Sequence, residues 1–190
     1  GFYTAEILDP NPKKTILKIL SAQKEYQKRN HYLHIAIAPT KNIERMEWFL
    51  EKATEIGIDE ITPIICDRSE RKDVKTERLN KVITSAVKQS IKAYHPKLNE
   101  PIRFKNFIEI TASAQKFIAH CMDSKKISLR EHMELNSDYL VLIGPEGDFT
   151  TAEVGLAINS GFIPISLGSS RLRTETAALE ACFEINFLNR

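Results

Sequence analysis

Two glycine-containing turns near the C-terminal end constrain the fold of this chain more than any other feature of its sequence. One lies within residues 143–149, after an apolar run at 139–143, and the other within residues 166–177, after an apolar run at 162–167. Glycine collects where the backbone needs a positive φ or must approach a ligand closely. Ligands of open α/β sheets bind beyond the carboxyl ends of the strands. The two turns therefore predict a nucleoside-sized pocket lined by main chain, and the alternative is that they are ordinary strand-to-helix turns.

Patterns typical of strands and helices alternate from residue 31 to the end of the chain. Apolar runs that predict buried strands lie at residues 33–38, 61–65, 116–121, 139–143 and 162–167, with a less legible one at 102–107. Apolar residues recur at helical spacing over residues 43–56, 79–91 and 174–188. Thr150 and Glu153 form a capping box, which predicts a further helix that ends at Gly161. The alternation predicts an α/β domain over residues 31–190, with a mostly parallel sheet flanked by helices.

The first part of the chain has a different pattern. Apolar residues alternate up to Ile7, a proline-rich turn follows at residues 9–12, and a second apolar run begins at Thr15. This pattern predicts a β-hairpin. A lone hairpin is marginally stable in water and normally belongs to a larger sheet.

The two glycine-containing segments also resemble known motifs. Residues 143–149 and 167–177 are similar to the two signatures of the bacterial 16S ribosomal RNA (uracil-N3) methyltransferase family, which belongs to the SPOUT superfamily. Further segments that agree lie at residues 44–57, 61–63, 67–69, 85–90 and 95–96, in the family's order along the chain. Two positions depart from the family pattern: Asp148 replaces a usual glycine, and Ser170 replaces a usual arginine, with Arg171 displaced by one position.

The resemblance implies more about the fold than the pattern does. It implies a C-terminal trefoil knot, whereas pattern alone favours an unknotted crossover. It also implies that a small PUA-like barrel precedes the catalytic domain. Residues 1–22 are then expected to be the C-terminal part of that barrel, apparently truncated, and residues 31–190 the SPOUT methyltransferase domain.

The resemblance further implies S-adenosylmethionine as the cofactor. Main-chain groups of the two turns would hold its adenine and ribose, and the end of the strand at residues 116–121 would lie beside it. Taken alone, the histidine at this strand end would more often be a satisfied core side chain. The residues expected to bind the cofactor are His120, Cys121, Ile143, Gly144, Pro145, Glu146, Gly147, Leu167, Gly168, Ser169, Leu172, Arg173 and Thr174.

Methylation of uracil N3 requires removal of its proton or stabilisation of the resulting anion. Arg173 and Arg68 are candidates to stabilise charge on the uracil oxygens or to bind phosphate. Glu175 is the nearest candidate base, although it could equally favour the N-terminus of the last helix through the helix dipole. These three residues are the expected catalytic groups.

A local excess of lysine and arginine between residues 68 and 105 is the candidate RNA-binding surface, since the net charge of +2 is too small to indicate one. A solvated helix face is the alternative explanation. The expected partners are 16S ribosomal RNA or the assembled small subunit, and a second copy of the chain bound through the apolar stripe of the last helix. The residues expected to contact RNA are Arg68, Arg71, Lys72, Lys88, Gln89 and Ser90.

The cysteines restrict the compartment and the metal chemistry. Cys66, Cys121 and Cys182 are odd in number and widely spaced, which argues against a disulfide framework and a zinc site. No apolar run approaches the roughly 20 residues that span a membrane. We therefore expect a cytoplasmic protein without a metal.

Two other functions remain open: a SPOUT enzyme that methylates a ribose 2′-hydroxyl or another base, and a non-catalytic RNA-binding module.

Overall fold

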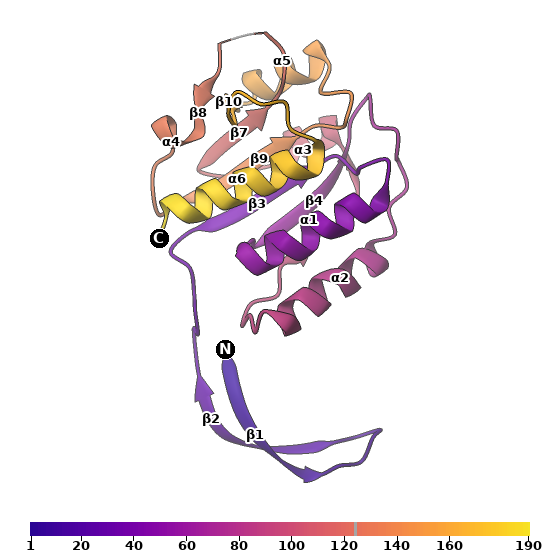
Figure 1. Ribbon diagram of the computed structural model, residues 1–190, viewed down its shortest axis with the longest axis vertical. Helices are drawn as coiled ribbons and strands as arrows, with labels where there is room; N and C mark the ends of the chain where they lie inside the picture. Colours follow the sequence, from indigo (N-terminus) through magenta and orange to yellow (C-terminus); the bar gives the residue numbers. More distant parts are fainter. Residues whose placement is uncertain (124) are drawn as a thin grey trace.

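The computed structural model describes residues 1–123 and 125–190, which form an eight-stranded sheet with helices on both faces and a separate hairpin (Figure 1). The strands are β1 (Phe2–Asp9), β2 (Ile16–Gln23), β3 (Tyr32–Ile37), β4 (Glu60–Ile65), β5 (Lys97–Leu98), β6 (Ile102–Arg103), β7 (Gln115–Ala119), β8 (Ile127–Ser128), β9 (Asp138–Ile143) and β10 (Ile163–Ser166). The helices are α1 (Ile43–Ile56), α2 (Thr76–Gln89), α3 (Phe104–Ile110), α4 (Leu129–His132), α5 (Thr151–Asn159) and α6 (Thr174–Leu188).

The large sheet is parallel in every strand pair that the structure describes, with the order β5-β4-β3-β9-β7-β10-β8 and β6 beside β4. The late strand β9 lies between β3 and β7. The carboxyl ends of β7, β9 and β10 therefore meet at one edge. The predicted α/β class with a mostly parallel sheet is confirmed. Within the described ranges, no helix has both the length and the apolar character that a membrane crossing requires.

Alternating side chains of the central strands divide the interior into two cores. On β3, Leu33, Ile35 and Ile37 point into the core beneath α1, α2 and α6, while Ala36 points into the core beneath α3 and α5. Such continuous apolar runs are typical of parallel strands that are covered on both faces.

One predicted element is only partly correct. The strand expected at residues 102–107 ends at Arg103, and Phe104 begins helix α3. The apolar residues Phe104, Phe107 and Ile108 follow helical spacing and are buried in the second core. The short run was ambiguous because Ile102 and Phe104 also fit the alternation of a strand.

The apolar stripe of helix α6 packs inside the same chain, which differs from the prediction. Ala178, Ala181, Cys182 and Ile185 are fully buried in the core of the same chain. The expectation that this stripe forms a contact between two copies is therefore wrong, because the sheet beneath the helix already covers it. The exposed apolar residues of α6 are Phe183 and Phe187, on the opposite side of the helix.

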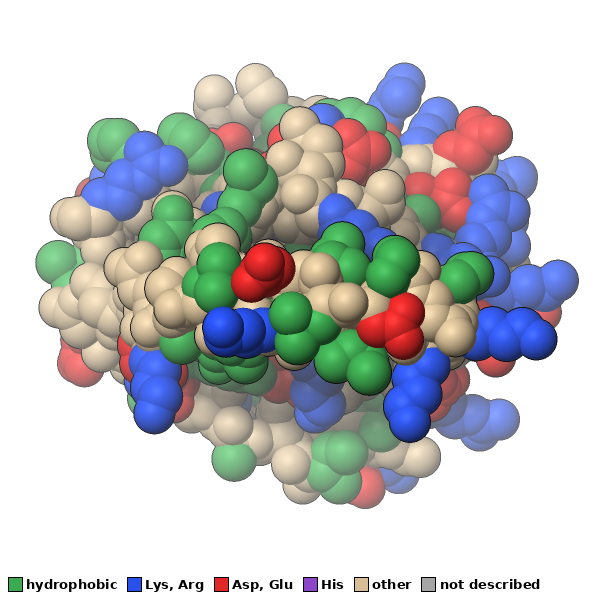
Figure 2. All heavy atoms as spheres, turned by 90° about the horizontal axis from the view of Figure 1, so that it is seen from below, with side chains coloured by type: hydrophobic (Ala, Val, Ile, Leu, Met, Phe, Trp, Pro, Cys, Tyr) green, Lys and Arg blue, Asp and Glu red, His purple; other side chains and the backbone are tan. Residues whose placement is uncertain are grey.

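The predicted hairpin is present as the antiparallel pair β1–β2, which projects away from the domain (Figure 1). Its apolar side chains are exposed on both faces of the ribbon, and several of them lie open on the face nearest the viewer in Figure 2. A surface with so many exposed apolar groups is typical of an interaction site. The most exposed of these side chains are Tyr3, Ile7, Leu8, Leu17, Ile19 and Leu20.

The predicted capping box is also confirmed, and it links α5 to a neighbouring loop. The Thr150 hydroxyl accepts a hydrogen bond from the Glu153 amide, and the Glu153 carboxylate accepts from the Thr150 amide. The second Glu153 oxygen accepts from the Asp67 amide at 2.9 Å. The box therefore fixes the helix start and the loop after β4 together.

We expect Thr150→Ala to lower the free energy of unfolding by about 1 kcal/mol, because the substitution leaves an amide at the helix start without its acceptor. Urea denaturation measures this loss. Thr150→Ser is the matched control, since it keeps the hydroxyl and should retain most of the stability. An equal loss in both variants would show that the threonine methyl group, and not the cap, stabilises this position.

Candidate active site

Two loops converge at the carboxyl edge of the sheet. The first loop (residues 144–150) follows β9, and the second loop (residues 167–173) connects β10 to α6. The hydroxyl of Thr174, at the start of α6, donates a hydrogen bond to the carbonyl of Gly144 at 3.1 Å. The end of β7 lies between the two loops because β7 separates β9 from β10 in the sheet. These three segments enclose a pocket.

The pocket consists of two adjoining cavities, of about 550 and 290 Å³, that share Ala119, Cys121, Asp148, Arg171, Leu172 and Ala177. This size is in the range of small-molecule sites. Every residue that we expected to bind the cofactor lines one of the two cavities. Those residues are His120, Cys121, Ile143, Gly144, Pro145, Glu146, Gly147, Leu167, Gly168, Ser169, Leu172, Arg173 and Thr174.

Sequence reasoning missed other lining residues, namely Ala119, Met122, Lys126, Ile165, Ser166, Asp148, Ser170, Arg171 and Ala177. Asp148 was noted from the sequence only as a departure from the family pattern. Several of these residues lie inside the two segments at 143–149 and 166–177, and most of the others lie within two positions of a predicted residue. Ala177 lies in the first turn of α6. The sequence could have indicated it, because the start of this helix was predicted at Thr174, next to the pocket.

Two glycines make the pocket possible for different reasons. Gly168 has φ +110°, which side chains of L-residues rarely adopt, and a Cβ atom there would project into open space. A Cβ atom at Gly144 would approach the Phe149 ring to 3.0 Å. Gly168 thus leaves room beside the second loop, and Gly144 lets the first loop fold over a buried aromatic ring.

His120 supplies polar groups that no other described residue satisfies. The residue is buried, and neither ring nitrogen has a hydrogen-bond partner among the described residues. Burial and the nearby Lys126 ammonium lower the pKa of the imidazole below its ordinary value, so the ring is neutral at pH 7. A neutral ring offers one donor and one acceptor. Such a pair fits the hydroxyls of a ribose or the edge of an adenine.

Asp148 holds the first loop against the end of β7. Its carboxylate accepts hydrogen bonds from the amides of Cys121 and Phe149, both at 2.9 Å. Its φ of +61° lies in the left-handed region, which favours glycine. Aspartate tolerates this conformation when its side chain bonds to the local backbone. The departure from the family pattern therefore preserves the shape of the loop.

Arg68 is one of the expected catalytic residues, and the structure places it under the first loop. Its guanidinium donates to the carbonyls of Gly147 at 2.9 Å and Phe149 at 3.4 Å. Part of its donor capacity therefore supports the loop. The residue is exposed and lines the larger cavity.

Arg173 and Glu175 lie together at the start of α6. Arg173 is the N-cap residue of the helix, and Glu175 is a buried acid in its first turn. The Glu175 carboxylate lies 3.8 Å from the Arg45 guanidinium. Arg173 lines the smaller cavity, Glu175 lines neither of the two cavities, and Arg68 lies under the first loop.

The expected RNA contacts fall into two separate groups. Arg68, Arg71 and Lys72 lie in the segment after β4, where Arg71 donates to the carbonyls of Thr40 and Lys41. This group adjoins the carboxyl edge of the sheet, since Arg68 contacts the first loop.

The second group lies at the C-terminal end of α2, whereas the first group precedes the N-terminal end of this helix. The second group consists of Lys88, Gln89 and Ser90. The 14 residues of this helix span about 21 Å, so the structure does not bring the two groups together. The Ser90 hydroxyl donates to the carbonyl of Ala86 at 2.6 Å, as expected for a group that closes the helix.

Comparison with known proteins shows which proteins share this sequence and fold. The family model of the RNA methyltransferase domain matches residues 27–186. Ribosomal RNA small subunit methyltransferase E of Mesomycoplasma hyopneumoniae is 29% identical over 184 residues, which cover 94% of this chain and 78% of that protein. A Porphyromonas gingivalis structure classed as an rRNA methyltransferase has a TM-score of 0.89 and 41% identity, and covers 98% of this chain and 80% of that chain. A Legionella pneumophila structure, classed as a methyltransferase and solved with its bound cofactor SAM, has a TM-score of 0.85 and 31% identity, and covers 98% of this chain and 78% of that chain.

The fold and the site define an α/β protein with a ligand pocket built from turns at the carboxyl edge of a parallel sheet. Because the family model matches most of the chain, this protein belongs to the family of RNA methyltransferase domains. The resemblance to small-subunit ribosomal RNA methyltransferases is confirmed.

Proposed function

We propose that this protein methylates N3 of a uridine in 16S ribosomal RNA of the small subunit, with S-adenosylmethionine as methyl donor. The observation that carries the proposal is the convergence of the two loops and His120 around a pocket in a chain of this family. The name of the Mesomycoplasma relative and the SAM-bound Legionella structure support the substrate and the cofactor. A ribosomal RNA substrate also suits the cytoplasm.

The residues of the pocket fit an S-adenosyl group. When bound, S-adenosylmethionine supplies a methyl group on a sulfonium. The main-chain groups of the two loops would bind its adenine and ribose, and the His120 nitrogens, which have no partner among the described residues, would complete their hydrogen bonds. Arg68, Arg173 and Glu175 act on the RNA side, where positive charge stabilises the uracil anion or phosphate and the carboxylate accepts a proton.

The test is methylation of small ribosomal subunits with isotopically labelled S-adenosylmethionine, followed by nucleoside analysis. We expect the label in 3-methyluridine. Label in a 2′-O-methylated nucleoside or another base would identify a different SPOUT activity. Binding of S-adenosylmethionine by calorimetry separates both outcomes from a non-catalytic RNA-binding module, which would give no heat of binding.

We further propose that the chain forms a homodimer through the exposed face of α6. Phe183 and Phe187 are 45% and 54% exposed, and their rings stack with centroids 5.8 Å apart. Two such faces can pack on each other in an isologous contact. Sedimentation should give a dimer at micromolar concentration and a monomer for the double variant Phe183→Lys, Phe187→Lys. A monomeric unmodified chain would rule out this contact.

We also propose that residues 167–173 thread beneath the first loop to form a trefoil knot. The support is that β10 lies beyond β7, whereas the following helix α6 packs on β3 and β9, so this segment must cross the edge where the first loop lies. Continuous electron density from β7 to α6 in a crystal structure tests the proposal. An unthreaded crossover would contradict it.

The hairpin of residues 1–22 is proposed to belong to a PUA-like barrel that helps residues 31–190 to bind RNA. Its exposed apolar faces support a role within a larger sheet or against a partner. A chain extended by a complete barrel should bind ribosomal RNA more tightly and with a steeper salt dependence, because it adds phosphate contacts. Equal affinity and salt slope would mean that residues 31–190 already form the whole RNA site.

A further inference from the structure

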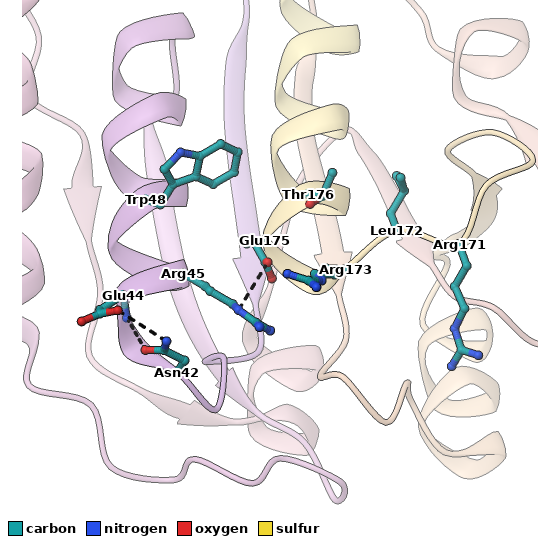
Figure 3. Close-up of a pocket in the computed structure, with 9 residues that line it drawn as sticks. All are labelled: Asn42, Glu44, Arg45, Trp48, Arg171, Leu172, Arg173, Glu175 and Thr176. Atoms are coloured by element: carbon teal, nitrogen blue, oxygen red, sulfur yellow. Dashed lines mark hydrogen bonds and ion pairs between the residues drawn. The ribbon is translucent and has the colours of Figure 1, made fainter.

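A second pocket lies between the start of α1 and the start of α6, next to the cofactor pocket (Figure 3). It has a volume of about 550 Å³. Trp48 and Arg45 line it from α1, and Glu175 lines it from α6. The second loop forms the remaining wall with Arg171 and Arg173. None of the functions proposed above requires an indole or an arginine at the start of α1.

Glu175 has an unusual environment in this pocket. Its side chain is only 8% exposed, and the nearest cation, the Nε atom of Arg45, lies 3.8 Å from Oε1, beyond hydrogen-bonding distance. The other oxygen, Oε2, is buried and has no hydrogen-bond donor among the described residues. The helix dipole favours a carboxylate here but provides no such donor. Because a buried carboxylate without donors is costly, the site suits a ligand that brings an N–H group.

The other walls suit the remaining parts of a nucleotide. The Trp48 side chain is 43% exposed, and an exposed indole is a platform on which a base can stack. Arg45, Arg171 and Arg173 place positive charge around the pocket, which suits phosphate. Aromatic surface, guanidinium groups and a carboxylate acceptor together match a nucleotide whose base carries an N–H donor, as uracil does at N3.

The α1–α6 pocket adjoins the cofactor site, where the methyl donor would be held. The second loop lines both pockets, since Arg171, Leu172 and Arg173 border this pocket and the smaller cavity of the cofactor site. Methyl transfer is an in-line displacement, so the acceptor must lie directly beside the donor. The three shared residues place a base in the α1–α6 pocket next to the cofactor site, as this alignment requires.

We propose that the α1–α6 pocket receives the uracil that is methylated, with Trp48 stacked on the base and Glu175 as the acceptor of its N3 proton. This proposal rests on the proposed function and assigns its acceptor site. The N3 atom forms a bond to the methyl carbon as the carbon–sulfur bond breaks and its electron pair moves to sulfur. The N3 proton passes to Oε2 of Glu175. The Arg45 guanidinium, 3.8 Å from the carboxylate, binds the adjacent phosphate.

The first test measures binding without the reaction. Trp48 is the only tryptophan in the sequence, so intrinsic tryptophan fluorescence reports on this pocket alone. We expect a tetra-uridylate to quench the emission, and the same oligonucleotide methylated at N3 to bind at least tenfold more weakly, because it lacks the donor to Glu175. Glu175→Ala should remove this difference. Absence of quenching, or equal affinity for the two oligonucleotides, would overturn the proposal.

The second test separates proton transfer from a structural role. Glu175→Gln should bind S-adenosylmethionine with unchanged affinity and methylate RNA at least a hundredfold more slowly at neutral pH. This deficit should shrink as the pH rises, because uracil N3 then ionises without a base. A deficit independent of pH would overturn the role of Glu175, while intact cofactor binding would leave the methyltransferase function standing.

Trp48→Ala provides a variant at a partly exposed position, which keeps the test valid if Glu175 variants fail to fold. It should raise the KM for RNA and leave cofactor affinity unchanged. A second copy of the chain is the competing occupant of this pocket, and tryptophan fluorescence distinguishes it from RNA. Tryptophan emission that changes with protein concentration in the absence of RNA would assign the pocket to the subunit contact and overturn the proposal.

Discussion

A Gly168→Val chain is expected to remain folded and to lose measurable affinity for S-adenosylmethionine. Gly168 has φ +110°, and its missing side chain leaves open space at the pocket wall. A β-branched residue is strained at this φ by about 1–3 kcal/mol, and relief of the strain would move the second loop. The methyl groups would also enter the space left for the ligand. Calorimetric titration measures the affinity, and circular dichroism confirms the fold.

Gly155→Ala is the matched control for this substitution. Gly155 lies within α5, and a Cβ atom there meets nothing within 4 Å. Alanine favours a helix over glycine, so this variant should keep its cofactor affinity and gain a few tenths of a kcal/mol or more in stability. If Gly168→Val binds S-adenosylmethionine as tightly as Gly155→Ala does, the cofactor site lies elsewhere.

The largest expected loss of stability is that of Phe149→Ala, about 3–5 kcal/mol. Phe149 is fully buried at the end of the first loop, and its ring lies 5.4 Å from that of Phe104. It also fills the space against Gly144. Removal of the ring leaves a cavity in the second core and frees the loop, so cofactor affinity should fall together with the midpoint of urea denaturation.

Phe183→Ala serves as the control for the loss of a phenyl ring. Phe183 is 45% exposed on α6, so its removal should change the stability of the monomer by roughly 0.5 kcal/mol or less. Equal unfolding midpoints for the Phe149 and Phe183 variants would mean that the ring of Phe149 does not anchor the first loop. A conservative Phe149→Leu substitution should recover much of the loss, because leucine fills most of the cavity.

Local sequence patterns predicted much of the fold because the apolar positions of most strands and helices are the ones that the structure buries. The apolar runs of β3 and β9 are continuous since both faces of the sheet are covered. The predictions failed where local patterns were ambiguous. Phe104 fits a strand and a helix equally well until its packing in the second core is known.

The residues that line the pocket at the carboxyl edge of the sheet were largely predictable because most of them lie within two contiguous segments and one strand end. The α1–α6 pocket was not predictable, because Trp48 and Glu175 are distant in the sequence and line one pocket only when α1 and α6 pack side by side. The stripe of α6 shows the same limit. Its spacing identifies a buried helix face, but spacing alone does not say whether the sheet of the same chain or a second copy covers it.

The most direct test of the central claim is a crystal structure of the chain grown with S-adenosylmethionine. We predict density for the adenosine between the first and second loops, with a hydrogen bond from His120 and the sulfonium methyl facing the α1–α6 pocket. Density at another place in the fold, or a His120 ring still without a partner beside the bound cofactor, would contradict the assignment of this site.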